Sequence, residues 1–301
     1  MSWPTGKGIS SDTIRSQQAN QGLFPLESYS TLKVSGDDRF SFLQGQVTCD
    51  MDRVSKGEAL LGAHLNLKGR IEASFIAFNS EDSVLLMLPK NQTEHLLQIL
   101  QKYALFANAS LEICDDFLPF LGWGNDNCLS QLIYRNSSIP QICLGLLSKE
   151  QLENLAPDTP IGTEQDALAI LARNGFIIAE EQQRAQYLPQ ELNYDMIDGI
   201  SFDKGCYKGQ EVVARIHFRG QVKQRCQPFA ANQEIPPGAS VNNDRAASCG
   251  QSINYVPPSV SSHSGYGCVL IKTSETESKT LHLEQNDEAE LQLLSLPYAI
   301  T

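Results

Sequence analysis

No stretch of the 301-residue sequence approaches the roughly 18 consecutive apolar residues that a membrane-spanning helix requires. The first residues, MSWPTGKGISSDTIRSQQANQG, lack the apolar segment of a secretory signal and predict a polar leader over 1–25. None of the eight cysteines belongs to a C-x-x-C pair, so the spacings typical of zinc and thioredoxin-type sites are missing. Without an export signal, a disulfide framework is not expected. These absences predict a cytoplasmic protein with no membrane partner and no metal site of its own.

Charge is distributed unevenly along the chain. The sequence carries 35 acidic and 23 basic residues, a net charge of −12, and a net acidic protein repels nucleic acid and anionic membranes. Residues 204–225 are the exception, because they contain six basic residues and one acidic residue, a net of +5. The rest of the chain carries 17 basic and 34 acidic residues, a net of −17. This contrast predicts a positive patch on an acidic body, although a solvated helix face would have the same composition.

Apolar periodicity and capping residues predict several helices in the first two thirds of the chain. One helix should open at Ser35, and a second should follow Pro89 with Leu96, Leu100 and Tyr103 on one face. A third is expected over 165–174. The capping signals are a capping box at Ser148 and Gln151, an N-cap at Thr163 and a terminating glycine at Gly175.

The predicted strands place an α+β region before a domain made of strands alone. Strands are expected over 59–65, 71–78, 84–88, 109–114, 129–134 and 141–147, and the first two form a hairpin. After residue 222, five short β runs separated by proline-rich turns predict a small antiparallel barrel or sandwich. We therefore divide the chain into the leader, an α+β region over 26–222 and a β domain over 223–301.

The segment around Cys206 combines glycine, lysine and cysteine in a way found nowhere else in the chain. Gly205 and Gly209 enclose it, and glycines at this spacing let the backbone turn sharply and approach a ligand. Lys204 and Lys208 flank Cys206, which precedes a predicted helix amino end; both features favour the thiolate over the thiol. We therefore predict a reactive or ligand-binding cysteine in an exposed position. The alternative is an inert, buried cysteine.

The helix that follows Cys206 is expected over 210–217. Its inward residues should be Val212 and Ile216, and Glu211 should pair with Arg215 one turn later. His217 shares this helix and could lie near Cys206, which spacing alone does not decide.

A longer motif supports a family assignment. The residues Lys204-Gly205-Cys206-Tyr207-Lys208-Gly209-Gln210-Glu211 resemble the K-G-C-Y-x-G-Q-E signature of YgfZ proteins and their mitochondrial iron–sulfur assembly relatives. The resemblance extends over nearly the whole chain beyond residue 30, through Gln44-Gly45-Gln46-Val47-Thr48, Gly62-Ala63-His64, Lys68-Gly69, Lys102-Tyr103-Ala104, Pro189-Gln190, Gly199-Ile200-Ser201-Phe202, Phe218-Arg219-Gly220 and Leu296-Pro297-Tyr298.

The resemblance implies a fold, a cofactor and partners. The fold would be a three-domain ring like the glycine-cleavage T-protein, with ferredoxin-like α+β layers and a C-terminal antiparallel β-barrel. Tetrahydrofolate would occupy its central channel, with Tyr29 at a position where related proteins place an aromatic ring beside the pterin. The family supports iron–sulfur enzymes, including those that thiolate tRNA. The partners would thus be folate and iron–sulfur client enzymes, with tRNA involved only indirectly and Cys206 as the catalytic residue.

The chain departs from the T-protein at the positions that carry its chemistry. The hairpin G-G-I-x-D-D reads Gly69-Arg70-Ile71-Glu72-Ala73-Ser74, so both aspartate positions lack a carboxylate. Glu72 is one residue away, and a shift of one residue in a strand points its side chain to the other face. Aminomethyl transfer would therefore lack its expected acid–base group.

Other positions of the folate pocket also differ. The second aromatic position falls at Ala167, which cannot stack, and a pterin-binding glutamate is replaced by Arg173. Arg173 can instead complement the carboxyl end of its helix. His64, in an apolar strand, is interpreted as a hydrogen-bonded structural histidine.

Three classes of function remain open. The first is a folate-binding accessory protein for iron–sulfur enzyme maintenance and tRNA thiolation, acting through Cys206. The second is a folate-dependent one-carbon transferase or demethylase, against which the missing carboxylates count. The third is a non-catalytic binding scaffold, against which the glycine-enclosed cysteine counts.

Overall fold

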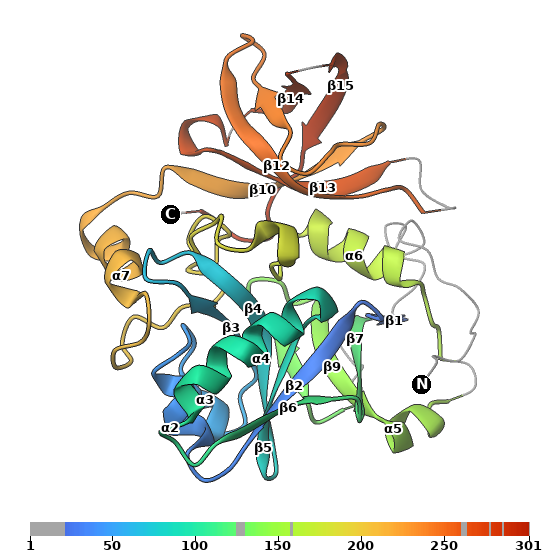
Figure 1. Ribbon diagram of the computed structural model, residues 1–301. Helices are drawn as coiled ribbons and strands as arrows, with labels where there is room; N and C mark the ends of the chain where they lie inside the picture. The colour runs from blue at the N-terminus through green and yellow to red at the C-terminus, as the bar shows by residue number, and fades with distance from the viewer. Residues whose placement is uncertain are drawn as a thin grey trace.

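Three β-sheets organise the chain in the computed structural model, which describes residues 22–124, 130–156, 159–259, 264–276, 278–284 and 286–300 (Figure 1). The five-stranded sheet has the order β3-β4-β5-β2-β6 and consists of β2 (Tyr29–Ser35), β3 (Leu60–Leu65), β4 (Ile71–Ser80), β5 (Ser83–Pro89) and β6 (Ser110–Cys114). All its pairings are antiparallel, and β3 and β4 form the predicted hairpin.

Three helices cover one face of this sheet and bury its apolar side chains. They are α2 (Arg39–Gln44), α3 (Met51–Ser55) and α4 (Lys90–Ala104). The helix expected from Ser35 begins only at Arg39, because β2 continues to Ser35 and Gly36 turns the chain at φ 102°. In α4, Leu96 and Leu100 are buried as predicted, but Tyr103 is 42% exposed and Ala104 takes the inner position.

A four-stranded antiparallel sheet with the order β1-β7-β9-β8 follows in the chain. It consists of β1 (Gly22–Pro25), β7 (Phe117–Trp123), β8 (Ile133–Arg135) and β9 (Ile142–Ser148). Gly22–Pro25, which we assigned to the polar leader, are therefore a buried strand, and residues 1–21 lie outside the described residues. The capping box at Ser148 opens α5 (Lys149–Glu153) as predicted.

The β domain is the predicted antiparallel barrel, closed in the order β10-β13-β12-β11-β14-β15. Its strands are β10 (Gln224–Ala231), β11 (Ser240–Asn242), β12 (Ser248–Val256), β13 (Gly265–Lys272), β14 (Thr280–Leu283) and β15 (Asn286–Leu293). A short 3-10 helix, η2 (Thr273–Glu275), follows β13. The segment after β15 returns to the α+β region, where Asn193 Nδ2 donates a hydrogen bond to Tyr298 Oη at 3.3 Å.

The helix α6 (Glu164–Arg173) lies beneath the barrel and joins the three sheets (Figure 1). Thr163 caps it and Gly175, at φ 65°, ends it, as predicted. Its buried residues share one apolar core with the four-stranded sheet, the open face of the five-stranded sheet and the near side of the barrel. A 3-10 helix, η1 (Glu181–Gln183), follows this region.

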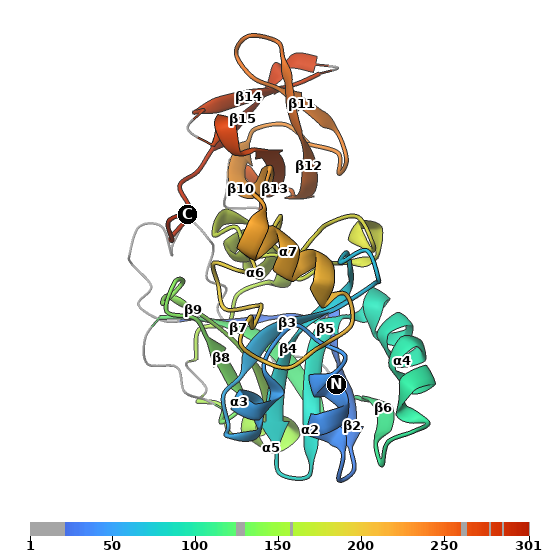
Figure 2. The same ribbon diagram turned by 90° about the vertical axis from the view of Figure 1, so that its left-hand side faces the viewer.

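The last helix, α7 (Gln210–Arg219), lies at the junction of the barrel and the five-stranded sheet (Figure 2). Within the described ranges, no helix combines the length and apolar character that crossing a membrane would require.

Candidate functional site

Cys206 lies at the surface, in the loop that precedes α7, as predicted. Gly209 ends this loop at φ 80°, and a Cβ there would lie 2.6 Å from the carbonyl oxygen of Asn66. Glycine is therefore required by the close approach of this loop to the β3–β4 hairpin. A Cβ on Gly205 would meet no atom within 4 Å, so that glycine has no comparable packing role.

Two neighbours of Cys206 anchor the loop from inside. Lys204 Nζ donates hydrogen bonds to the carbonyl oxygens of Val47 at 2.9 Å and Cys49 at 2.7 Å. It also lies 5.2 Å from the ring centre of Tyr207, which is buried. Burial lowers the pKa of the Lys204 ammonium to about 8. The chain is thus tied to the protein interior on both sides of the exposed Cys206.

The two lysines that we expected to act on Cys206 both have other contacts. Lys204 faces the carbonyls described above, and Lys208 Nζ lies 5.0 Å over the ring of Tyr103 in α4. Gln210 Oε1 accepts a hydrogen bond from the Tyr207 backbone N–H at 3.4 Å, at the start of α7. Stabilisation of a Cys206 thiolate by its surroundings stays a prediction.

The orientation of α7 differs from the predicted one. Val213 is its buried residue, whereas Val212 and Ile216 are half-buried. Val212 packs against Gly69 at the tip of the hairpin, which turns the helix so that Val213 faces the core. Glu211 and Arg215 are both exposed, and in the described part of the chain they form no ion pair with each other.

His217 lies at the other end of α7 from Cys206. Its ring stacks on Phe202 with 3.7 Å between ring centres and 13° between planes. Its ring also contacts Phe218, with 4.7 Å between ring centres. Proximity of His217 to Cys206 stays a prediction, since Phe202 belongs to the same loop as Cys206.

Tyr29 lines a cavity of about 350 Å³ between α6, the barrel and the five-stranded sheet. The other walls come from α6, from the segment after it and from β12, and they include Glu164, Phe176, Glu180 and Tyr255. Burial, followed by the Glu180 carboxylate, raises the pKa of the Tyr29 phenol. The cavity thus combines aromatic rings with two carboxylates.

The altered folate positions lie outside this cavity wall. Ala167 is fully buried and faces the core, whereas Leu168, Leu171 and Ala172 line the cavity from the same helix. Arg173 is exposed in the last turn of α6, where a cation complements the helix dipole.

The two hairpin positions that lack aspartate serve the core. Ala73 is fully buried under α4, and Ser74 Oγ accepts a hydrogen bond from the Ala179 backbone N–H at 2.7 Å. Our expectation that Glu72 points to the opposite face from Ala73 is wrong, because the register shifts at this residue. The bulge turns Glu72 toward α4, where its carboxylate lies 3.1 Å from Nε2 of His95.

His64 is buried as predicted but lacks the predicted hydrogen bonds. It is fully inaccessible, and within the described residues neither ring nitrogen has a partner. Burial, followed by the positive charges of Lys208 and His95, lowers its pKa to about 3.

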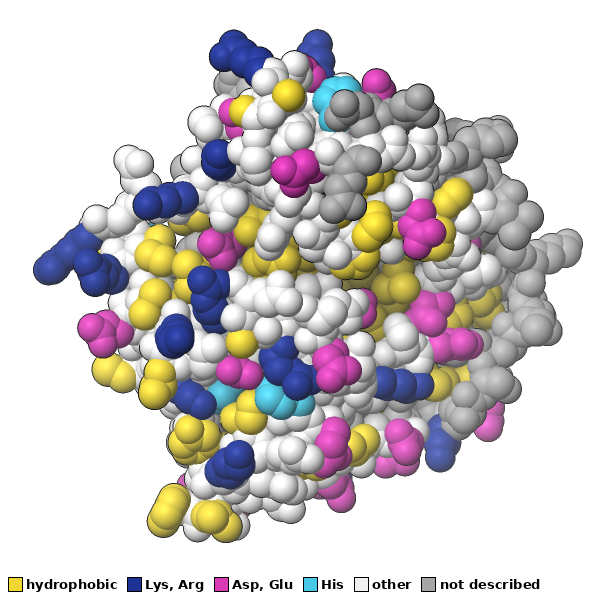
Figure 3. Space-filling view, turned by 45° about the horizontal axis from the view of Figure 1, so that its top comes forward, with side chains coloured by type: hydrophobic (Ala, Val, Ile, Leu, Met, Phe, Trp, Pro, Cys, Tyr) yellow, Lys and Arg dark blue, Asp and Glu magenta, His cyan; other side chains and the backbone are white. Residues whose placement is uncertain are grey.

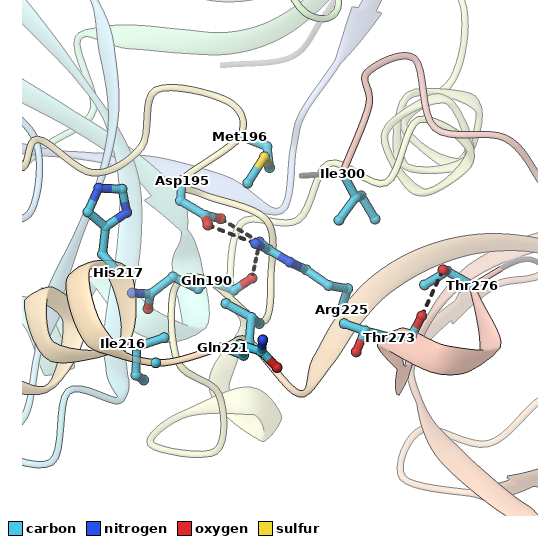
Figure 4. A pocket seen from close by; sticks show the side chains of 12 residues that line it. Gln190, Asp195, Met196, Ile216, His217, Gln221, Arg225, Thr273, Thr276 and Ile300 are labelled. Atoms are coloured by element: carbon cyan, nitrogen blue, oxygen red, sulfur yellow. Dashed lines mark hydrogen bonds and ion pairs between the residues drawn. The ribbon is translucent and has the colours of Figure 1, made fainter.

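A second cavity, of about 730 Å³, lies between α7 and the barrel and was not predicted (Figure 4). Arg225 crosses it to form a buried ion pair with Asp195, at 2.6 and 3.0 Å, and to donate a hydrogen bond to the Gln190 carbonyl. Arg225 was counted in the positive patch, and its burial removes it from the surface. No sequence signal identified Asp195 as its partner, since 30 residues separate the two.

Comparisons with known proteins bear on the whole chain. No protein-family model matches it. In structure, it is similar to the glycine cleavage system aminomethyltransferase T of Bartonella henselae, with a TM-score of 0.68 over 93% of this chain and 86% of the other. At 12% identity this likeness shows the fold alone, and it confirms the predicted T-protein-like fold.

Sequence relatives give a closer match. The tRNA-modifying protein YgfZ of Colwellia psychrerythraea is 32% identical over 236 residues, which cover 71% of this chain and 72% of the relative. The YgfZ protein of Aliivibrio fischeri is 30% identical over 241 residues, which cover 74% of this chain and 75% of the relative. With this identity over most of both chains, the protein belongs to the YgfZ family of tRNA-modifying proteins.

Proposed function

We propose that this protein is a folate-binding accessory protein that supports iron–sulfur enzymes of tRNA modification through the Cys206 thiol. The observation that carries the proposal is exposure: of the seven cysteines in the described ranges, Cys206 alone is exposed. The other six are buried and cannot meet a partner without unfolding. The names of its relatives support the link to tRNA modification.

The chemistry of a thiolate fits this role. Thiolates ligate iron and attack sulfur. With a partner that carries a persulfide, the Cys206 thiolate would attack the outer sulfur, form a new S–S bond and release the partner's thiolate. The anchored Lys204 and Tyr207 support the proposal, because they tie the chain on both sides of Cys206 to the protein interior while Cys206 itself stays exposed.

The cavity beside Tyr29 supports folate binding. Its volume, about 350 Å³, lies within the usual range of small-molecule sites. A pterin presents a flat ring and adjacent N–H donors. Tyr29 and Tyr255 offer aromatic rings against which the flat pterin can stack. Glu164 and Glu180 offer carboxylates that can accept hydrogen bonds from its N–H groups.

The test is replacement of the sulfur. Cys206→Ser should keep the fold, because it barely changes volume, and should fail to restore tRNA thiolation in a strain that lacks the gene. Cys114→Ser, at a buried cysteine on β6, is the matched control and should restore it. Full complementation by Cys206→Ser would show that the cysteine is dispensable and would leave the scaffold function.

A further inference from the structure

We infer that Cys206 lies within a docking surface for an acidic partner protein. The apolar side chains of this surface would contact apolar side chains of the partner. The Cys206 face, as we call this surface, comprises the hairpin tip (Leu67, Lys68), the end of α4 (Lys102, Tyr103, Leu105, Phe106), Lys208, and the outer side of α7 (Arg215, Phe218, Arg219). This docking surface rests on the proposed function, because it names the kind of protein that would meet Cys206. Docking and the role of the thiol can be tested separately.

Exposed apolar side chains are the first observation. The exposed fraction is 82% for Leu67, 81% for Leu105, 93% for Phe106 and 69% for Phe218. Among the six large apolar side chains that are exposed in the described ranges, Ile113 alone lies outside the Cys206 face. Large apolar side chains gathered on one side of a protein mark interaction sites, since burial of each such side chain is favourable.

Direct contacts join the segments of this face around Cys206. Lys208 Nζ lies over the Tyr103 ring, which connects the Cys206 loop to α4. The same loop touches the hairpin at Gly209, and the hairpin touches α7 at Gly69. Figure 2 views this side, with α7 in front and α4 to its right. The face is therefore one surface built from three elements.

The positive charge of the Cys206 face favours a partner with a negative surface. Lys68, Lys102, Lys208, Arg215 and Arg219 lie on it, against the acidic Asp203 and Glu211, whereas the whole chain carries −12. Figure 3 shows hydrophobic and basic side chains interspersed along its left-hand side, around α7, with a few acidic side chains among them. A basic rim around apolar side chains is complementary to an acidic rim around an apolar centre.

Two other occupants fit this surface less well. RNA would use the rings of Tyr103, Phe106 and Phe218 and the cations, but it would leave the aliphatic Leu67 and Leu105 without a partner, because they offer no ring for a base to stack on. The acidic body also repels a long polyanion. A second copy of this chain would bring the same basic side chains face to face in a two-fold dimer. An acidic protein can bury the apolar side chains of the Cys206 face and form ion pairs with its basic side chains.

Site-specific cross-linking tests the inference. Phe106 is replaced in cells by the photoreactive residue benzoylphenylalanine, which cross-links to proteins that touch it. The same replacement at Ile113, outside the Cys206 face, is the control. Each cross-linked protein is identified, purified and titrated against the unmodified chain and against two variants, Leu105→Ser/Phe106→Ser and Lys102→Glu. Both changes fall on exposed side chains and should leave the fold intact. The matched controls are Ile113→Ser and Arg245→Glu, the latter on an exposed barrel loop.

The expected result is an acidic protein that cross-links from position 106 and not from 113. Its Kd should rise at least about tenfold in both face variants, should be unchanged in both controls, and should rise with salt. Cross-links to RNA alone, to a second copy alone or to nothing would overturn the inference, as would equal binding to all variants. Cys206→Ser should retain docking, so loss of tRNA thiolation with intact docking separates the thiol's role from that of the face.

Discussion

Acidification from pH 7.5 to 5.5 should destabilise the protein through His64, and His64→Leu should remove that part of the loss. The imidazole is fully buried, and its two nitrogens have no partner in the described residues. Leucine of similar size therefore removes no hydrogen bond and leaves no large cavity. Burial lowers the pKa of His64 to about 3 in the folded protein, from an ordinary value of 6.5.

The sign follows from proton binding. Between pH 6.5 and 3 the unfolded chain binds a proton at His64 that the folded chain excludes, so stability falls as the pH falls through this window. The loss is about 1.4 kcal/mol per pH unit once the pH is below 6.5. Over the interval from 7.5 to 5.5 the wild type should lose about 1.4 kcal/mol more than His64→Leu.

Urea unfolding at both pH values measures this difference. The other histidines are present in both proteins, so their titration cancels in the comparison. Equal losses of free energy in wild type and variant would refute the reasoning, because they would mean that the folded protein accepts the proton at His64.

Three further predictions concern the cavities and the hairpin. Tyr29→Ala should weaken tetrahydrofolate binding by about 1 kcal/mol, because it removes one aromatic contact, and titration calorimetry measures this change. Unchanged affinity in Tyr29→Ala, or an equal loss in the control Tyr103→Ala outside the cavity, would contradict this prediction. Aminomethyl transfer with the other glycine-cleavage proteins should stay at background in a standard turnover assay, and measurable turnover would point to Glu72. Arg225→Met should lower the free energy of unfolding by about 3–5 kcal/mol, since it leaves the Asp195 carboxylate buried without its cation. Urea unfolding measures this change in the free energy of unfolding. A decrease below about 1 kcal/mol would mean that water reaches the Asp195 carboxylate.

Features that depend on neighbouring residues could be predicted from the sequence. The β3–β4 hairpin, the capping box at Ser148 and the helix end at Gly175 agree with the structure, because turn and capping preferences act over a few residues. The barrel strands could be recognised by their spacing, and the exposure of Cys206 by the glycines and lysines around it. The family could be assigned because its signature is one continuous motif.

Tertiary structure decided the features that depend on distant residues. The partner of Arg225, the contacts of Lys204 and Lys208 and the orientation of α7 each involve segments far apart in the sequence. The bulge at Glu72 lies within the β3–β4 hairpin, where no sequence signal marked it. The same holds for the Cys206 face, whose apolar side chains come from a hairpin and two helices. A local pattern records whether a side chain suits a helix or a strand. Which of its faces is covered depends on the elements packed against it, and only folding brings those together.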